Sequence, residues 1–339
     1  MMKNKKIMII GGSGSLGMSL IENLGNDNEL HILSTDESKH WAINNRFNEL
    51  NLNFAIADIR DYDRMNRIIL RVNPEIIIIA SALKHVDVCE LNPKESIETN
   101  ISGIVNVVNI VEDRQNELTN LETVLMVSTD KACSPINVYG MCKSISERVV
   151  LERARHIKNI KFVATRYGNV LETRGSIVPL FMHQAEHNEY FTVTREDMTR
   201  FVMTLNDSVN LIVNCIENAK SGETFIPKIK SMNIMDLAEI FSKRYNKEIK
   251  IIGIRSGEKL HEDLINETES LRTIECDDIF IVKPIYETKI YNDDVFTYTS
   301  SQGTMSKKEL EEYLVSVNIF EKDVDSFTQT VKLDDIRKT

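Results

Sequence analysis

Short runs of β-branched and apolar residues alternate with segments of helical periodicity through the first half of the chain. The runs have the length of buried strands and lie at residues 6–10, 29–33, 53–56, 76–80, 123–128 and 161–167. Between them, apolar residues recur every three or four positions, as Ile97, Ile101 and Ile104 do. A repeated strand–helix–strand order predicts an α/β fold built on a doubly wound parallel sheet with helices on both faces.

The alternation weakens after about residue 170. Helices are expected at residues 235–245 and 306–314, without regular strand partners. The 339 residues suit one large or two modest domains, and no flexible linker or internal repeat divides them. We therefore expect a larger domain at residues 1–168 plus about 198–226, a smaller C-terminal domain at about 169–197 plus 227–320, and a tail at 321–339.

Charge and composition restrict the classes of partner. The chain carries 41 Lys and Arg against 51 Asp and Glu, a formal net charge of −10, whereas nucleic-acid binding needs clustered cations. No apolar run approaches the roughly 18 residues of a membrane span, and the apolar stretch after the basic N-terminus is too short for a signal peptide. We expect a mature N-terminus and a protein that binds neither nucleic acid nor a membrane.

The five cysteines indicate a reducing compartment. No two have C-x-x-C spacing, and their odd number fits free thiols. His85, Asp87, Cys89 and Glu90 form a dense group of possible ligands, but the sequence offers no partner cluster for them. The sequence therefore predicts a cytoplasmic protein without a metal site.

A glycine-rich loop directly follows the first predicted strand. Gly11, Gly14 and Gly17 have the spacing G-x-x-G-x-x-G and precede an apolar helix. In such a unit the first glycine permits a tight turn, the second lets backbone N–H groups approach a pyrophosphate, and the third lets helix and strand pack closely. This pattern predicts a Rossmann fold. We expect the dinucleotide to contact Gly11, Ser13, Gly14, Ser15, Leu16 and Gly17.

The residues after the second and third strands bear on which dinucleotide is bound. An acid at the end of the second strand commonly binds the ribose 2′-hydroxyl, whereas a cation binds a 2′-phosphate. Hydroxyls, an acid and a lysine occur together there, at Ser34, Thr35, Asp36 and Lys39. This mixture leaves NAD and NADP open. Asp58, followed by Ile59, either binds the adenine amino group or opens the helix before Asp61.

Tyr139 and Lys143 form a Y-x-x-x-K pair in the helix after the fifth strand. Four-residue spacing places both side chains on one helix face. Tyrosine, with an ordinary pKa of about 10, is a poor base at neutral pH, but an adjacent ammonium favours the phenolate, which can take a proton from an alcohol. The motif also fits a surface Tyr–Lys pair. Its place in the predicted sheet favours alcohol oxidation, with both residues beside a nicotinamide cofactor.

Thr129, Asp130 and Lys131 stand at the carboxyl end of the fifth strand, where ligands bind in sheets of this kind. A carboxylic acid can protonate a leaving hydroxyl, and a lysine whose pKa is lowered by neighbouring cations can remove a proton from carbon. The alternative is a solvated turn capped by Asp130. Because Tyr139 and Lys143 are expected nearby, the catalytic interpretation is favoured.

Several segments together resemble the inverting, 5-epimerising UDP-N-acetylglucosamine 4,6-dehydratases of the extended short-chain dehydrogenase/reductase superfamily. They are GGSGSLG at 11–17, ASALKHVD at 80–87, ETNISG at 98–103, STDKACSPINVYGMCK at 128–143, RYGNVLETRGSIVP at 166–179, MTRF at 198–201, IPKIKSM at 226–232 and GIRSGEKLHE at 253–262. The resemblance covers nearly the whole chain. Its most specific part is residues 128–143 with 255–259, because related epimerases and glucose-type dehydratases usually lack Lys131 after the aspartate.

The resemblance implies an intramolecular redox cycle on a nucleotide sugar. Tyr139, assisted by Lys143 and Thr129, would remove the 4-hydroxyl proton while hydride passes from C4 to the nicotinamide. Lys131 would take the C5 proton, Asp130 would protonate the departing 6-hydroxyl, and hydride would return to C6. The Asp130/Lys131 pair would also serve reprotonation of C5 from the opposite face. The product would be a 6-deoxy-4-keto sugar of inverted configuration at C5.

The resemblance also implies how cofactor and substrate are held. NADP would stay tightly bound and be recycled; NAD is the alternative, because Thr35 stands where the family usually has arginine. Further cofactor contacts would come from Ala80, Ala82, Lys84 and Asn100. The UDP-sugar would be held by Lys84, Asn169, Arg174, Thr194, Arg200, Arg255 and Glu258. Arginine suits this role because its planar fork binds phosphate oxygens in a bidentate manner.

Other functions stay open at this point. A retaining dehydratase or a 4-epimerase of another nucleotide sugar would share the glycine loop and the Tyr–Lys pair, although inversion at C4 needs no acid for a leaving group at C6. A non-catalytic NADP-binding sensor would share the fold, although it would not need Asp130, Lys131, Tyr139 and Lys143. The family also implies a homo-oligomer, a dimer or a hexamer, and a place in polysaccharide biosynthesis.

Overall fold

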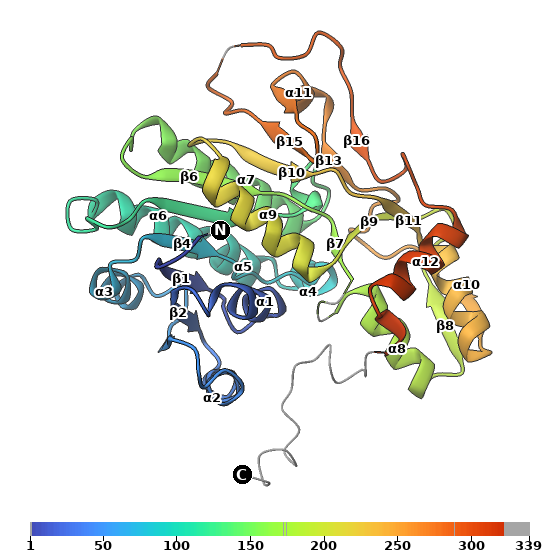
Figure 1. Ribbon diagram of the computed structural model, residues 1–339. Helices are drawn as coiled ribbons and strands as arrows, with labels where there is room; N and C mark the ends of the chain where they lie inside the picture. Colours follow the sequence, from blue (N-terminus) through green and yellow to red (C-terminus); the bar gives the residue numbers. More distant parts are fainter. Residues whose placement is uncertain (1, 172, 174, 288, 322–339) are drawn as a thin grey trace.

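A nine-stranded sheet forms the largest layer of the computed structural model, which describes residues 2–171, 173, 175–287 and 289–321 (Figure 1). The strand order is β14-β15-β10-β6-β5-β4-β1-β2-β3. The parallel strands are β1 (Lys6–Ile10), β2 (Glu29–Ser34), β3 (Leu52–Ile56), β4 (Ile76–Ile79), β5 (Thr123–Val127), β6 (Lys161–Thr165) and β10 (Thr224–Pro227). The antiparallel strands β15 (Ile279–Val282) and β14 (Thr273–Glu275) extend the edge beyond β10.

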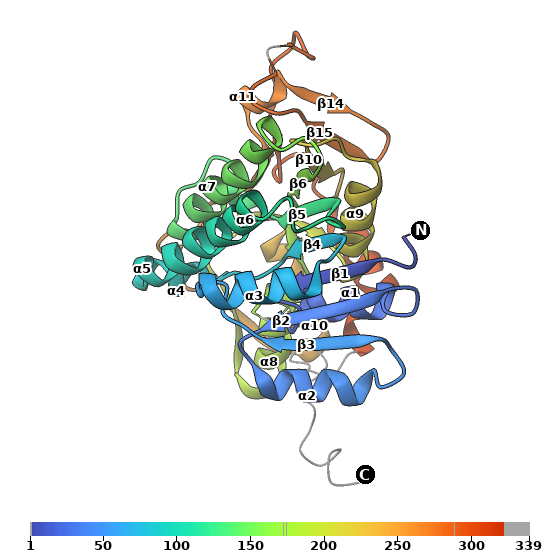
Figure 2. The ribbon, with the colours of Figure 1, turned by 90° about the vertical axis from the view of Figure 1, so that its left-hand side faces the viewer.

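Helices cover both faces of this sheet (Figure 2). One face carries α1 (Ser15–Leu24), α2 (Glu37–Arg46) and α9 (Leu205–Asn218); the other carries α3 (Tyr62–Val72), α6 (Gly103–Asp113) and α7 (Val138–Glu152). Successive side chains of a strand point to opposite faces. Ile7 and Ile9 accordingly join the apolar cluster with α1 and α9, whereas Met8 and Ile10 join the cluster with α3 and α6. The predicted α/β fold with a doubly wound sheet is confirmed.

Short elements connect the strands and helices at the edges of the sheet. They are α4 (Val86–Leu91), α5 (Pro93–Ile97), the π-helix η1 (Glu98–Ser102), and the 3₁₀ helices η2 (Asp130–Ala132) and η3 (Arg153–Arg155). Several of the longer helices start at residues whose side chains accept backbone N–H groups. Asp36, Asp61 and Asn137 cap α2, α3 and α7 in this way, which stabilises a helix by about 1 kcal/mol.

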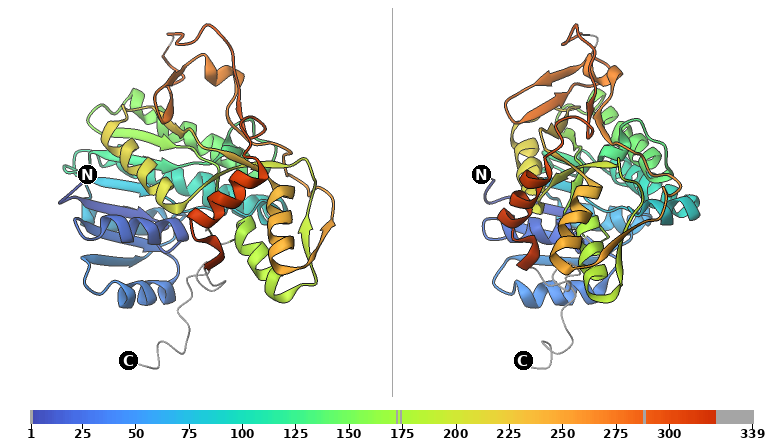
Figure 3. Two further views of the ribbon diagram at one scale, coloured as in Figure 1. Left: turned by 45° about the vertical axis from the view of Figure 1, so that its right-hand side comes forward. Right: turned by 90° about the vertical axis from the view of Figure 1, so that its right-hand side faces the viewer.

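Part of the second half of the chain forms a group of helices beside the sheet layer (Figures 1 and 3). It contains α8 (Ile177–His187), α10 (Ile234–Tyr245), α12 (Lys307–Ser316) and the 3₁₀ helix η4 (Ile319–Glu321), together with the parallel strands β8 (Tyr190–Val193) and β12 (Glu248–Ile251). An apolar cluster of its own includes Phe181, Phe191 and Phe241, with rings in mutual contact. The helices expected at residues 235–245 and 306–314 are confirmed.

Further short strands lie between these two groups. β9 (Thr199–Met203) pairs with β7 (Asn169–Val170) and β11 (Ser231–Asn233), while β13 (Asp263–Ile265) pairs with β16 (Tyr298–Thr299) just before the short helix α11 (Glu267–Ser270). The expectation that α10 lacks a strand partner is wrong, because α10 packs beside β8 and β12. Strands of two to five residues are too short to display a period of two in sequence. The division into two domains stays a prediction.

No helix in the described part of the chain is both long and apolar enough to cross a membrane.

Candidate active site

The glycine loop makes a close turn between β1 and α1. Gly11 has φ +89°, and a Cβ there would lie 2.6 Å from the backbone nitrogen of Ser81, so only glycine fits. A Cβ on Gly17 would overlap the carbonyl oxygen of Gly12. Gly14 is the N-cap of α1, and a Cβ there would lie 3.4 Å from Gly11 O, an ordinary contact. A glycine there puts no side chain between the positive helix end and a phosphate.

The other loop residues expected to bind cofactor lie in this same turn. Ser13 and Ser15 are buried, and Leu16 is half-buried at the start of α1. The turn begins where β1 ends and packs against the segment that follows β4, which contains Ala80 and Ala82. The structure therefore brings the glycine loop and the segment at residues 80–84 together at the carboxyl ends of adjacent strands.

The polar side chains that follow β2 mostly form hydrogen bonds and ion pairs with one another. Asp36 caps α2 by accepting from the backbone N of Lys39 at 3.1 Å, and its Oδ2 lies 2.5 Å from Lys39 Nζ. The hydrogen bond from Lys39 holds the pKa of Asp36 below its usual range, although burial opposes this. Ser34 Oγ lies 2.7 Å from His40 Nε2, and Thr35 is exposed. These contacts do not separate NAD from NADP.

Asp58 is paired with an arginine. Arg60 donates to both carboxylate oxygens at 2.6–3.0 Å, and this interaction lowers the pKa of Asp58. The alternative that Asp58 opens the next helix is wrong, because Asp61 is the N-cap of α3. The neighbouring Ile59 is buried and packs under Gly103.

Asn100 is fully buried in the π-helix η1. Its Oδ1 accepts from Leu83 N at 2.9 Å, and its Nδ2 donates to Leu83 O at 2.9 Å and to Ser96 Oγ at 3.2 Å. The side chain thus fixes the backbone of the segment that carries Ala82 and the exposed Lys84. Asn100 therefore holds the segment from which cofactor contacts are expected.

Tyr139 and Lys143 are both buried on α7. Lys143 Nζ donates to Val127 O, at the end of β5, at 2.7 Å. Burial lowers the pKa of Lys143 to about 8, against the raising effect of Glu147. Burial and the charge of Asp130 hold the pKa of Tyr139 above its ordinary value, although a hydrogen bond with Thr129 lowers it. This is the reverse of the direction expected from an adjacent ammonium.

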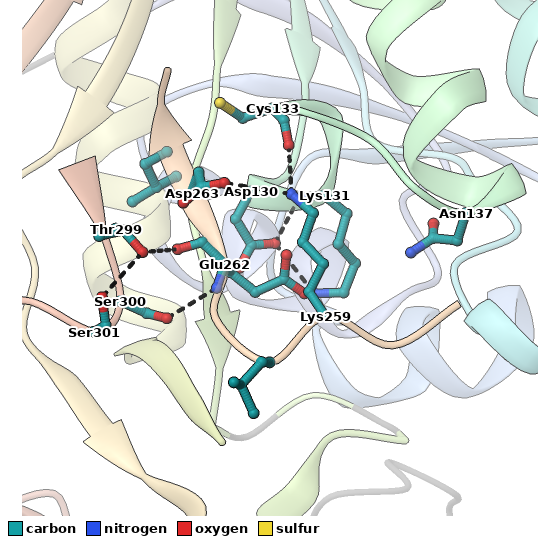
Figure 4. Close-up of polar contacts among 12 residues, drawn as sticks. Asp130, Lys131, Cys133, Asn137, Lys259, Glu262, Asp263, Thr299, Ser300 and Ser301 are labelled. Atoms are coloured by element: carbon teal, nitrogen blue, oxygen red, sulfur yellow. Dashed lines mark hydrogen bonds and ion pairs between the residues drawn. The ribbon is translucent and has the colours of Figure 1, made fainter. Parts of the chain in front are cut away.

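Asp130 and Lys131 lie in η2, directly after β5, with their side chains in contact (Figure 4). Asp130 Oδ1 accepts from Thr129 Oγ1 at 2.8 Å and from Lys131 Nζ at 3.2 Å. Burial alone would lower the pKa of Lys131, but Asp130 and Glu262 raise it. The expectation that neighbouring cations lower this pKa is therefore wrong, because the two carboxylates outweigh the opposing charge of Arg200.

Glu262 is a functional candidate that the sequence did not reveal. Its Oε1 lies 3.1 Å from Lys131 Nζ, and its carboxylate is buried (Figure 4). Ser300 accepts from Glu262 N at 2.9 Å, which fixes the backbone at that point. The only available signal was its place as the last residue of the GIRSGEKLHE segment. The contact between Glu262 and Lys131 forms only because the fold brings these distant parts of the chain together.

The segment before Glu262 is bound to α7 and η2. Asn137, the N-cap of α7, donates to Gly257 O at 2.7 Å, and Lys259 Nζ donates to Cys133 O at 2.9 Å. Arg200 of β9 is buried and donates to the carbonyl oxygens of Lys259 and Leu260 at 2.9 and 3.2 Å. Arg200 therefore holds the backbone of this segment, and it lies close enough to Lys131 and Glu262 for its charge to lower the pKa of each.

The other residues expected to hold the nucleotide sugar are spread along the segments beside the sheet. Asn169 lies in β7, and its Oδ1 is buried without a hydrogen bond from any described residue. Thr194 is half-buried after β8. Arg255 is exposed, and its backbone N donates to Glu258 Oε2 at 3.1 Å. Arg174 lies outside the described residues.

Among the described residues there is no group of three or more His, Cys, Asp or Glu side chains that could hold a metal ion. The chemistry available at the carboxyl ends of β4 and β5 is that of the buried Tyr139, two lysines and two carboxylates. These groups can move protons on and off a bound alcohol and its carbon skeleton.

The chain is similar to known proteins over most of its length. A family model described as polysaccharide biosynthesis protein matches residues 7–284. The inverting UDP-N-acetylglucosamine 4,6-dehydratase of Campylobacter jejuni is 38% identical over 292 residues, 84% of this chain and 84% of the relative. The UDP-glucose 4-epimerase of Rickettsia rickettsii is 35% identical over 290 residues, 83% of each chain.

The X-ray structure of Pen from Bacillus thuringiensis superposes with a TM-score of 0.86 at 33% identity, covering 94% of this chain and 99% of that one. Sequence and structure thus agree over both the sheet and the helices beside it. The chain belongs to the polysaccharide biosynthesis protein family of extended short-chain dehydrogenase/reductase enzymes, whose members similar to it include nucleotide-sugar 4,6-dehydratases and 4-epimerases.

Proposed function

We propose that the protein is a UDP-N-acetylglucosamine 4,6-dehydratase that inverts C5. The observation that carries this proposal is the buried contact of Asp130, Lys131 and Glu262 beside Tyr139. Loss of water across C5 and C6 needs a base for the C5 proton and an acid for the 6-hydroxyl, and this cluster supplies both. The Campylobacter relative, which its name describes as an inverting UDP-N-acetylglucosamine 4,6-dehydratase, supports the same reaction.

The glycine loop fits a dinucleotide cofactor. Gly11, Gly14 and Gly17 leave room where any side chain would fill the turn or stand before the α1 N-terminus. Gly11, Ser13, Gly14, Ser15, Leu16 and Gly17 would hold the pyrophosphate, with Ser34 to Lys39 at the ribose and Tyr139 and Lys143 near the nicotinamide. A bound NAD(P) would supply the hydride acceptor for oxidation at C4 and the hydride donor for reduction at C6. We propose NADP, with NAD as the alternative, held tightly between cycles.

The protein groups would divide the proton transfers among them. Tyr139 takes the 4-hydroxyl proton. Its hydrogen bond with Thr129 favours the phenolate, and Lys143, one turn along α7, adds a positive charge. Asp130, as the neutral acid, gives a proton to the 6-hydroxyl as it leaves as water. Lys131, as the neutral amine, takes the C5 proton. The Asp130/Lys131 pair then supplies a proton to the opposite face of C5, as inversion requires.

We also propose that the UDP-sugar is held by Lys84, Asn169, Arg174, Thr194, Arg200, Arg255 and Glu258. The exposed Arg255 can bind a phosphate directly, whereas Arg200 acts by shaping the 259–260 backbone. The homo-oligomer and the cytoplasmic location stay predictions.

An NMR experiment in D2O tests the proposal. The purified protein is incubated with UDP-N-acetylglucosamine, without added cofactor, and the product is followed by proton and carbon spectra. We expect a 4-keto-6-deoxy sugar of L-arabino configuration with deuterium at C5. Unchanged substrate would contradict the proposal. A product of retained configuration would correct it to a retaining dehydratase.

A 4-epimerase is the second candidate, because the Rickettsia relative described as a UDP-glucose 4-epimerase matches over 83% of each chain. An epimerase would convert the substrate to its C4 epimer and leave C5 and C6 unlabelled. The position of deuterium therefore separates the two reactions in one spectrum.

A further inference from the structure

Lys131 is held between two buried carboxylates. Its Nζ lies 3.2 Å from Asp130 Oδ1 and 3.1 Å from Glu262 Oε1 (Figure 4). Each of the two acidic residues is 1% exposed. Asp130 Oδ2 and Glu262 Oε2 are also buried, and neither accepts a hydrogen bond from a described residue. The cluster is therefore a base flanked by two acids, with little water around it.

This arrangement poses a difficulty for the proposed reaction. An ammonium between two carboxylates is well stabilised, yet Lys131 must be a neutral amine to take the C5 proton. Asp130 must carry a proton to act as the acid, so Glu262 is then the remaining carboxylate in contact with Lys131. A proton that moves from Nζ to Oε1 converts a buried ion pair into a neutral amine and a neutral acid, which burial favours.

We propose that Glu262 is a positioning residue that accepts the ammonium proton of Lys131 through their direct hydrogen bond and so makes Lys131 the base at C5. This inference rests on the proposed function. The N–H bond of Lys131 breaks and an O–H bond forms on Glu262. Lys131 then takes the C5 proton, the C5–H electrons form the C5–C6 double bond, and the C6–O electrons leave with the Asp130 proton as water.

The surroundings of Glu262 agree with such a role. The charged groups that face it are Lys131 and Asp130 of η2, Arg200 of β9, and Lys259 of its own segment. Burial raises the pKa of Glu262, although Lys131, Arg200 and Lys259 lower it. Arg200 and Lys259 already donate to backbone carbonyl oxygens, whereas Lys131 contacts the Glu262 carboxylate directly.

The test is Glu262→Gln in the full-length protein, with Glu262→Asp and Glu223→Gln alongside. Glutamine keeps the length and the acceptor oxygen but cannot take the proton. Glu223 is another buried carboxylate paired with a lysine, Lys283, and it lies outside the cluster. Single-turnover reactions would follow C4 oxidation by the absorbance of reduced nicotinamide and elimination by NMR of the product.

We expect Glu262→Gln to slow elimination by about 10²- to 10⁴-fold, the usual effect of losing a proton-transfer group, while C4 oxidation stays near the wild-type rate. Reduced cofactor should accumulate. Glu262→Asp should recover part of the lost rate, and Glu223→Gln should behave as wild type.

The pH profile separates this role from a structural one. In the wild type the alkaline limb is the loss of a proton from Glu262, whose pKa is raised by burial. In Glu262→Gln that carboxyl group is absent and the limb is set by the Lys131 ammonium, whose pKa Asp130 still raises, so the limb moves to higher pH. Two results for Glu262→Gln would overturn the inference. One is elimination at the wild-type rate; the other is an equal loss of rate in C4 oxidation and elimination, with the alkaline limb of the pH profile unchanged. If the wild type itself forms no 4-keto-6-deoxy product, the proposed function fails, and this inference fails with it.

Discussion

The two lysines of the candidate site show how strongly a residue depends on its surroundings. Lys143 meets the carbonyl oxygen of Val127, and burial lowers its pKa to about 8. Lys131 meets two carboxylates, which raise its pKa in spite of burial. The ammonium group therefore loses its proton more readily than usual at Lys143 and less readily than usual at Lys131. One of the two carboxylates, Asp130, is the preceding residue, whereas the other, Glu262, is remote in sequence.

Lys143 should make stability depend on pH. Its pKa is about 8 in the folded protein against an ordinary value of 10.5, so between these values the unfolded chain binds more protons. The free energy of unfolding should therefore rise with pH above about 8, by up to about 1.4 kcal/mol per unit from this group. Urea unfolding at two pH values in this range should show a larger rise in the wild type than in Lys143→Met. Equal rises would contradict the assignment.

Replacing Lys131 by alanine should stop elimination. Without the amine no group in the described cluster can take the C5 proton, so the reaction should halt after C4 oxidation, with a loss of about 10²-fold or more in product formation. Affinity for UDP should stay near that of the wild type, because Lys131 is expected to contact the sugar end. Isothermal titration with UDP and product NMR measure the two effects. Full activity in the variant would remove Lys131 from the mechanism.

At the scale of elements, the site depends on how α7, η2 and the segment at residues 253–262 fit together. Gly140 lies where α7 touches η2, and a Cβ there would overlap the carbonyl oxygen of Lys131. Asn137 caps α7 and also donates to Gly257 O at 2.7 Å. The helix that carries Tyr139 is therefore fixed directly against the turn that carries Asp130 and Lys131.

Gly140→Ala tests this contact. In an open helix the change would stabilise the protein by about 1 kcal/mol through helix propensity. Here the overlap with Lys131 O should cost more, about 1–3 kcal/mol, and shift η2 away from Tyr139. Chemical denaturation should show a net loss, whereas Met141→Ala, at the neighbouring exposed position, should change stability little. A Gly140→Ala protein more stable than the wild type would show that the contact is relaxed.

At the scale of the whole molecule, a buried ionic network joins the sheet layer to the segments beyond it. Arg166, just after β6, lies 2.5 Å from Glu147 of α7 and 2.7 Å from Glu269 of α11. It also donates to Leu264 O of β13 at 2.9 Å. Because β13 follows Glu262 directly, this network helps to hold the cluster around Lys131 in place.

Arg166→Met should destabilise the protein strongly. Removing the guanidinium leaves the buried Glu147 without its ion-pair partner and leaves Glu269 with Arg272 alone, at 3.5 Å, a change that typically costs about 3–5 kcal/mol. The matched control is Arg195→Met, because Arg195 forms an exposed pair with Asp197 that is worth about 1 kcal/mol or less. Thermal and urea unfolding of both variants measure the difference. Similar losses in the two variants would mean that the network is not a main support of the fold.

Much of the fold could be predicted from local pattern. Apolar runs and helical spacing indicated the doubly wound sheet, and α10 and α12 were expected within two residues of their bounds. The strands β14 and β15 were not foreseen, because runs of three or four residues carry too little periodicity. Their pairing at the sheet edge depends on backbone partners that lie elsewhere in the chain.

The sequence by itself determined the glycine turn, the Tyr139–Lys143 pair and the adjacent Asp130 and Lys131, because each depends on residues close together in the chain. Only the tertiary structure decided the charge state of this set. It placed Glu262 against Lys131 and reversed the expected direction of the Lys131 pKa shift. It also showed that Asn100 and Arg200 form hydrogen bonds to the backbone of other segments. Electrostatic and hydrogen-bond energies depend on distance and burial in three dimensions, and sequence spacing does not fix either quantity.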